Sequence, residues 1–225
     1  MTETIPATFE VLDERFRACS GDGRIERLAG RCRWAEGPVY VPAGRYLVWS
    51  DIPNDRMLRW DEATEAVGVF RQPAGYTNGN TLDAEGRMLS CEHGGRRVSR
   101  TEHDGSVTTI ADRIDGKRLN HIRRFALGAD GRLTDAGVFA ECTAGVFDGI
   151  RLDTTGRIWA AAGDGVHCYA PDGTLLGKLL IPETVSNLVF GGPKRNRLFV
   201  AASTSIYSIL LNVNGAPGPW QQPRG

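Results

Sequence analysis

A polar side chain recurs at the same place in successive copies of one sequence unit. Glu36, Asn78 and Asp148 each stand eight positions before the glycine of a Gly-Arg pair. Each copy continues with a few apolar residues, a polar turn that ends in Gly-Arg and a second apolar run, which is typical of a β-hairpin. If the copies are arranged around an axis, the residue at the entrance of every hairpin points to one central place. The repeat therefore predicts a site assembled from distant parts of the chain.

These hairpins alternate with hairpins of a second type, which have a basic or aromatic strand, a tight turn and a further apolar strand. The turns include Asp104-Gly105 and Asp172-Gly173, where glycine can take a positive φ. Two hairpins give four strands in roughly 40 residues, which is the repeat of a β-propeller blade. The sequence therefore predicts an all-β propeller of the six-bladed type. The hairpins of the first type span residues 35–51, 77–92, 147–164 and, less regularly, 186–203.

The alternation fails once, between residues 120 and 121, where two hairpins of the second type follow one another. Restoring it needs three hairpins of about 20 residues, so about one and a half blades are missing. We expect one domain over residues 1–212, an open or rearranged ring of four to five blades, followed by a disordered tail at 213–225. Exposed strand edges would permit self-association. The candidates for ring-closing strands are the runs 8–16, 24–30 and 205–212.

Composition excludes several classes of protein. Lysine plus arginine equals aspartate plus glutamate at 27 each, so no net field favours nucleic acid or a membrane surface. The chain has no run of 18 apolar residues, and its acidic start lacks an apolar signal core, so we expect a soluble, cytoplasmic protein. The five cysteines show no C-x-x-C spacing, and we interpret them mainly as small buried residues.

Several sequence runs are specific enough to suggest a family. They include AEGPVY at 35–40, SCEHGGRR at 90–97, GKRLN at 116–120 and the long run from Asp148 to Gly173. The chain resembles the family of senescence marker protein, gluconolactonase and luciferin-regenerating enzyme. Members of that family are six-bladed propellers that hydrolyse sugar lactones and related esters with one divalent metal in the central channel. The resemblance implies a lactone hydrolase whose partner is a small-molecule lactone.

The resemblance also implies roles for individual residues. Glu36 matches the metal-binding glutamate of the family, and Asp148 matches its aspartate, which is a metal ligand and the general base. The family uses two further asparagines, in Pro-Asn-Asp and Pro-Asn-Gly motifs, and neither motif occurs here. Both would lie in the missing segment, so the resemblance and the repeat count locate the same loss.

Lactone hydrolysis needs a Lewis acid to polarise the carbonyl and a base to activate water. Carboxylate and amide oxygens suit hard cations, so calcium is the first candidate, with zinc as the alternative. Amide oxygens could come from three asparagines, and two residues after the second inner strand could touch substrate or complete the site. The further candidates are Asn78, Asn80 and Asn187 for the amides, and Glu92 and His93 after the strand.

Each candidate has a structural competitor. Glu36 and Asp148 could simply cap turns, Asn78 precedes a glycine as turn asparagines often do, and His93 could be a hydrogen-bonded structural histidine. Two functions stay open. The chain is a metal-dependent lactone hydrolase whose activity is impaired by the missing ligands, or it is a non-catalytic propeller remnant that acts as a binding or scaffold protein. Calcium binding would separate them.

Overall fold

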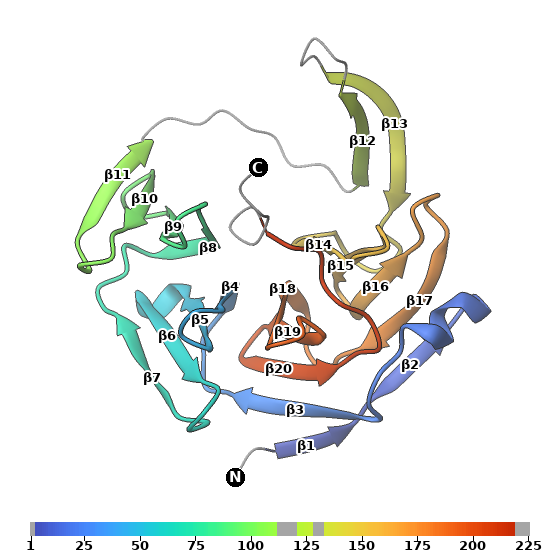
Figure 1. Ribbon diagram of the computed structural model, residues 1–225, viewed down its shortest axis with the longest axis horizontal. Coiled ribbons are helices and arrows are strands. Elements are labelled where there is room, and N and C mark those ends of the chain that lie inside the picture. The colour runs from blue at the N-terminus through green and yellow to red at the C-terminus, as the bar shows by residue number, and fades with distance from the viewer. Residues whose placement is uncertain (1–2, 112–120, 128–132, 219–225) are drawn as a thin grey trace.

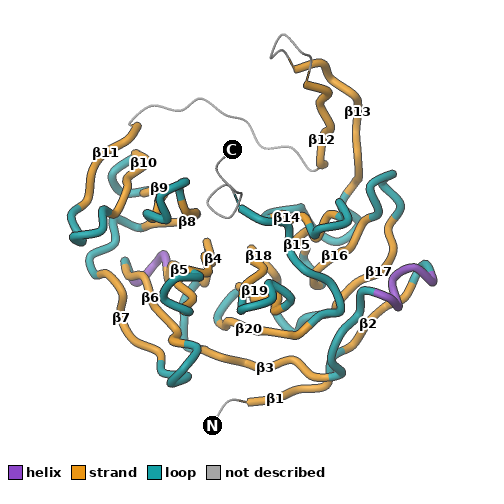
Figure 2. Tube along the Cα trace, viewed as in Figure 1, coloured by secondary structure: helices purple, strands orange, loops and turns teal. Residues whose placement is uncertain are grey.

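The described residues form β-strands arranged around a central axis and joined by turns and loops (Figure 1). The computed structural model describes residues 3–111, 121–127 and 133–218. Two short 3-10 helices, η1 (Glu14–Ala18) and η2 (Ile52–Asn54), are the only helical segments within these ranges (Figure 2). The predicted all-β class is therefore confirmed.

Two blades are built from consecutive hairpins, as the repeat predicts. Each is an antiparallel sheet of four strands whose first strand lies nearest the centre of the ring (Figure 1). The first blade consists of β4 (Ala35–Val41), β5 (Tyr46–Asp51), β6 (Arg56–Asp61) and β7 (Val67–Arg71). The second blade consists of β8 (Thr77–Leu82), β9 (Met88–Glu92), β10 (Arg97–Thr101) and β11 (Val107–Ala111).

Two more blades include strands from the N-terminal segment. The outer edge of one is β2, which pairs with β17, while β3 pairs with β20 in the other and carries β1 at its far side. The first of these sheets contains β14 (Ile150–Leu152), β15 (Ile158–Ala162), β16 (Gly165–Tyr169), β17 (Leu175–Leu180) and β2 (Thr8–Val11). The second contains β18 (Val185–Gly191), β19 (Arg197–Ala202), β20 (Ser205–Leu210), β3 (Arg24–Ala29) and β1 (Glu3–Pro6).

The N-terminal closing strands follow the prediction in part. The run 24–30 pairs with the run 205–212, as expected. The run 8–16 is a strand only as far as Val11, because the Asp13 carboxylate accepts a hydrogen bond from the Arg15 backbone N–H at 2.9 Å and caps η1. This short helix leaves the sheet edge and buries Phe16 completely.

The remaining strands form a two-stranded hairpin of β12 (His121–Leu127) and β13 (Leu133–Glu141). The described residues thus form four blades and half of a fifth. This number matches a six-bladed propeller that has lost one and a half blades. The ring is open between β11 and this hairpin (Figure 1). Residue 120, on one side of the predicted seam, lies outside the described residues.

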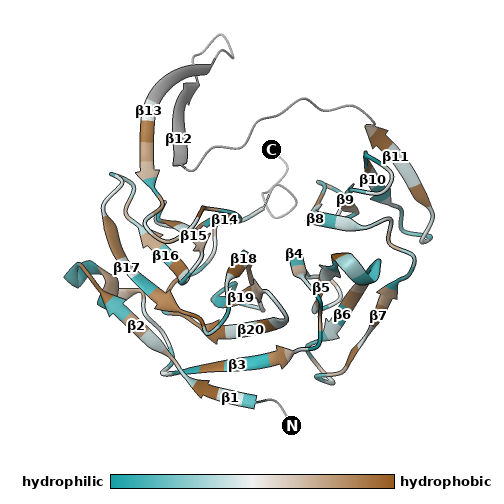
Figure 3. Cartoon of the chain, turned by 180° about the vertical axis from the view of Figure 1, so that it is seen from behind, coloured by the Kyte–Doolittle hydropathy of each residue, from teal (hydrophilic) through white to brown (hydrophobic). Residues whose placement is uncertain are grey.

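The core lies between neighbouring blades. Trp49, Trp60 and Trp159 are fully buried there, and Phe199 stacks on Tyr40 with ring centroids 5.6 Å apart. Strands such as β17 and β20 are accordingly rich in hydrophobic residues (Figure 3). At the other extreme, all five residues of the edge strand β11 are exposed, which is the kind of edge from which self-association was predicted.

The chain end lies against the inner strand β14. The Gly215 N–H donates to Arg195 O at 2.7 Å, and the Ala216 N–H donates to Leu152 O at 2.9 Å. Residues 213–218 of the expected disordered tail are thus hydrogen-bonded to two blades, while 219–225 lie outside the described residues. Within the described part of the chain, no helix has the length and apolar character needed to cross a membrane.

Candidate active site

The entrances of the inner strands meet near the centre of the ring. A Cβ added to Gly37 would lie 2.1 Å from the carbonyl oxygen of Asn78, which places the start of β4 against the start of β8. A Cβ added to Gly149 would lie 2.1 Å from Asn187 Oδ1, which places the segment before β14 against β18. Glycine is required at these close approaches because any side chain would collide with the neighbouring strand.

Glu36 stands at the centre of this arrangement. Its carboxylate is buried, and Oε2 accepts hydrogen bonds from the Gly37 backbone N–H and from Asn187 Nδ2, the latter at 3.1 Å. Burial raises the pKa of Glu36 above its ordinary value, although the two hydrogen bonds oppose this shift. The negative charge of Asp148 raises the pKa further. The two predicted carboxylates are therefore close enough to repel each other.

Asp148 lies two residues before β14, and its side chain is exposed. Its backbone N–H donates to Ala161 O at 3.2 Å, and the next residue, Gly149, donates to Ser186 O at 3.0 Å. These bonds fix the peptide that carries Asp148 to β15 on one side and to β18 on the other. The carboxylate is thus held on a rigid base while it stays accessible to solvent.

Asn187 connects β18 to the Glu36 carboxylate on β4. Its Nδ2 donates to Glu36, and its Oδ1 accepts the Leu188 N–H at 2.9 Å. The neighbouring Ser186 hydroxyl donates to Ala35 O at 2.7 Å and so ties β18 to β4. Asn187 therefore lies in the predicted cluster, where it orients Glu36.

Asn78 and Asn80 lie on β8 and differ in their surroundings. The Asn78 side chain is exposed, and the backbone carbonyl oxygen of Asn78 accepts a hydrogen bond from the Ser50 hydroxyl at 3.0 Å. Asn80 is buried, donates to Gly37 O at 2.9 Å and accepts the Ser90 hydroxyl at 2.7 Å. The amide of Asn80 thus joins two blades, whereas Asn78 keeps a free approach to its side chain.

The sequence placed Glu92 after the second inner strand, but Glu92 is the last residue of β9 and only His93 follows it. Burial would raise the pKa of Glu92, but hydrogen bonds from Arg97 at 2.7 Å and Ser99 at 2.6 Å outweigh it and lower that pKa. Arg71 approaches the same carboxylate at 3.5 Å. Glu92 is therefore held inside its blade, and His93 lies exposed in the following turn.

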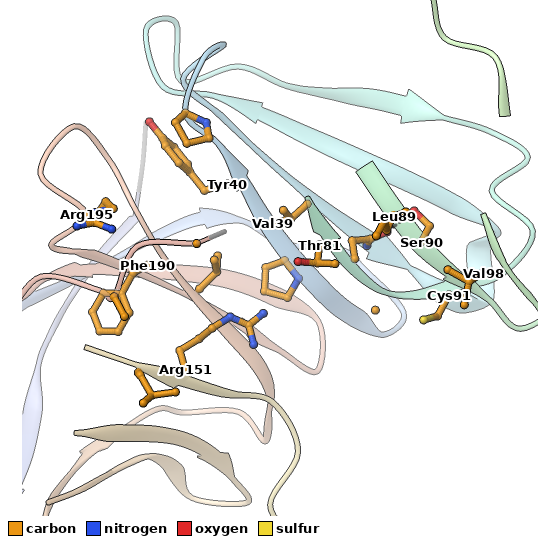
Figure 4. Close-up of a pocket in the computed structure, with 18 residues that line it drawn as sticks. Val39, Tyr40, Thr81, Leu89, Ser90, Cys91, Val98, Arg151, Phe190 and Arg195 are labelled. Atoms are coloured by element: carbon orange, nitrogen blue, oxygen red, sulfur yellow. Dashed lines mark hydrogen bonds between the residues drawn. The ribbon is translucent and has the colours of Figure 1, made fainter. Parts of the chain in front are cut away.

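A cavity of about 480 Å³ lies further along the same inner strands. Its walls come from β4, β8, β9, β14, β18 and the chain end, and Figure 4 shows Arg151 reaching into it from β14. Arg151 was not among the predicted residues. Its position three residues after Asp148, on a predicted inner strand, was the available signal.

The carboxylates of Glu36 and Asp148 are the candidate ligands for a divalent cation. The charge of Asp148 acts on the Glu36 carboxylate, and a cation held by both residues would relieve this repulsion. Among the residues with described positions, no group of three histidine, cysteine, aspartate or glutamate side chains could hold a metal. The pair thus fits a hard cation as a partial ligand set that water or amide oxygens would complete.

Comparison with known proteins identifies related sequences. The family model described as SMP-30/Gluconolactonase/LRE-like region matches residues 34–129 and 118–204, two segments that overlap beside the predicted seam. A gluconolactonase of Zymomonas mobilis subsp. mobilis is 23% identical over 85% of this chain and 82% of its own length. The pentonolactonase XacC of Haloferax volcanii is 27% identical over 76% of this chain and 82% of its own length.

Solved structures agree with the fold. The gluconolactonase XC5397 from Xanthomonas campestris superposes with a TM-score of 0.76 at 26% identity, covering 93% of this chain and 95% of that one. Regucalcin from Agrobacterium tumefaciens, a calcium-binding protein, superposes with a TM-score of 0.65 at 17% identity, covering 97% of this chain and 99% of that one. The second likeness concerns the fold alone.

Proposed function

The chain belongs to the SMP-30/gluconolactonase/LRE-like family, and on this premise we propose that it hydrolyses a sugar lactone with a divalent cation held by Glu36 and Asp148. The gluconolactonase and pentonolactonase relatives support the choice of substrate class. The single observation that carries the proposal is the buried Glu36 carboxylate, which the Gly37 N–H and the Asn187 amide hold in place at the entrance of β4. The charge of Asp148 acts on this carboxylate, and a hard cation would neutralise both charges.

Calcium fits this donor set better than zinc. Calcium takes about six to eight oxygen ligands and accepts several waters among them. A catalytic zinc site needs about three protein ligands plus an open position. Glu36 and Asp148 provide two carboxylates, with Asn78 as the amide whose side chain is exposed at the same rim. We therefore propose calcium as the cofactor.

The residues divide the chemistry between them. A bound divalent cation would act as a Lewis acid at the lactone carbonyl. Asp148, which is exposed and rigidly supported, takes a proton from the attacking water, whose oxygen forms a bond to the carbonyl carbon. The ring C–O bond then breaks, and protonated Asp148 returns its proton to the ring oxygen, which becomes a hydroxyl group of the product. Glu36 keeps its orientation through Asn187, so its carboxylate stays in position to hold the cation.

A non-catalytic remnant is the second candidate function. It is favoured by the absence of a third histidine, cysteine, aspartate or glutamate beside the pair in the described ranges. It is also favoured by the open ring, which leaves one side of the β8–β11 blade without a neighbouring blade (Figure 1). In this case the protein would bind a ligand or a partner without turnover. The predicted cytoplasmic location and self-association are not needed by either function and stay predictions.

Release of acid from glucono-δ-lactone, followed with a pH indicator, tests the proposal. The chelated protein should be inactive, calcium should restore activity, and Asp148→Asn should lower kcat by about 100-fold or more. Asp104→Asn is the matched control, because Asp104 lies in an exposed turn and bonds only locally to Ser106. If the calcium-loaded protein showed no rate above that of Asp148→Asn, the remnant function would replace the hydrolase.

A further inference from the structure

The cavity beyond the carboxylate pair has an unusual charge pattern. Of the 18 residues that line it, two are arginines, Arg151 and Arg195, and none is aspartate or glutamate. Much of the remaining wall is apolar, from residues such as Val39, Leu89 and Val189. A lining that contains arginines and no carboxylates favours an anionic ligand, and its apolar part weakens the screening of charge interactions.

Arg151 is the better placed of the two arginines. It is half-buried, and its Nη1 donates to the carbonyl oxygen of Ile150 at 2.7 Å. None of the ion pairs found among the described residues includes Arg151. Burial lowers its pKa, and the nearby charge of Glu36 opposes this shift, yet Glu36 is not in ion-pair contact with it. A guanidinium removed from water gains most from a carboxylate or phosphate that it can bind in bidentate fashion.

Arg151 also lies on β14, the inner strand that directly follows Asp148. Arg151 follows Asp148 by three residues, which is about 10 Å of extended chain. Figure 4 shows the side chain pointing into the cavity between β4 and β14. A ligand whose reacting carbonyl lay at Asp148 would therefore present its other end to Arg151.

We propose that the cavity binds an anionic group, carboxylate or phosphate, at the end of the ligand remote from the reacting carbonyl, and that Arg151 recognises it. This inference rests on the proposed function and narrows its substrate class to acidic sugar lactones. Neutral sugar lactones would still reach Asp148, but they would leave the guanidinium without an anion.

Calorimetric titration of the full-length protein with open-chain sugar acids tests this inference without any turnover. Gluconate carries acid only at the reacting carbon, glucarate adds a carboxylate at the far carbon, phosphogluconate adds a phosphate there, and sorbitol is neutral. We expect one of the two remote acids to bind about tenfold or more tightly than gluconate. The tighter of the two then identifies the source of the charge.

Three variants accompany the titration. Arg151→Met should remove the preference for the remote acid, Arg151→Lys should retain part of it, and Arg17→Met should leave it unchanged because Arg17 is an exposed residue of η1. Equal affinity for gluconate and both remote acids, or an undiminished preference in a folded Arg151→Met protein, would overturn the inference. Loss of the proposed hydrolase function would instead appear as inactivity toward every lactone, with anion binding intact.

Discussion

Replacing Gly149 with alanine is expected to disturb the site through a contact that the structure defines closely. The φ of Gly149 lies outside the left-handed region, so alanine is compatible with its backbone. The added Cβ would lie 2.1 Å from Oδ1 of Asn187, 2.4 Å from its Cγ and 2.9 Å from its Cα. Asn187 must therefore move, and its hydrogen bond to Glu36 at 3.1 Å is lost when it does.

The size of the effect follows from two contributions. Overpacking a tight contact costs about 1–3 kcal/mol, and losing a hydrogen bond to a charged group costs about 1.5–3 kcal/mol. Because both act through the same side chain, they do not add fully, and we expect the free energy of unfolding to fall by about 3 kcal/mol. Urea denaturation at pH 7 without divalent cations, followed by tryptophan fluorescence, measures this loss.

Two controls separate this contact from a general cost of alanine. Gly68→Ala should change stability by less than about 0.5 kcal/mol, since nothing lies within 4 Å of a Cβ at that position on β7. Adding Asn187→Ala to Gly149→Ala removes the contacts with Oδ1 and Cγ but keeps the contact with Cα. The double variant should therefore lose less stability than the sum of the losses of the two single variants, but it should still be less stable than Asn187→Ala alone. A loss below about 1 kcal/mol for Gly149→Ala, or full additivity in the double variant, would refute the reasoning.

The remaining predictions concern stability. Burial raises the folded-state pKa of Glu36, so the contribution of this residue to folding stability is present at low pH and is lost as pH rises through that pKa. Without divalent cations, Glu36→Gln should therefore gain stability over wild type as pH rises above about 4, which urea melts at several pH values measure. The pKa of Glu92 is lowered because hydrogen bonds, chiefly from Arg97, outweigh burial. Glu92→Gln should therefore lower the free energy of unfolding by about 3 kcal/mol at pH 7, and this loss should shrink as pH falls through the folded-state pKa. A loss that stays constant with pH would contradict the argument. Phe16→Ala should lower the free energy of unfolding by about 3–5 kcal/mol, because the Phe16 ring is buried and its centroid lies 6.2 Å from that of Trp159. A smaller loss in the same melts would show that η1 is not part of the core.

Sequence repeats predicted most of the fold because hairpin turns carry local signals. Gly86 and Gly156 have φ of +78° and +79°, so two of the three Gly-Arg pairs hold the turn geometry for which glycine is suited. In the first copy the positive φ falls on Arg45, at +50°, instead of on Gly44. The spacing of the pairs therefore located the turns without fixing their type, which depends on how many residues each turn contains.

The candidate site was predictable from the sequence where residues occupy the same position in each repeat. It was less predictable where contacts between blades determine what a residue does. Glu36 and Asp148 stood in the repeated slot, and in the structure the charge of Asp148 acts on Glu36, while their role as joint ligands stays a prediction. No local pattern showed that the Asn80 amide joins two blades, since its partners are more than 40 residues away or on another strand. Arg151 was missed for the same reason, because a cavity between strands is not visible in the spacing of any one of them.

The central claim is that Glu36 and Asp148 bind one cation between them, and calcium titration of the chelated protein by calorimetry tests it most directly. We predict one site per chain with micromolar or tighter affinity, lost in Glu36→Gln and in Asp148→Asn and kept in Asp104→Asn. Absence of heat at millimolar calcium, or binding that survives either substitution, would contradict the claim.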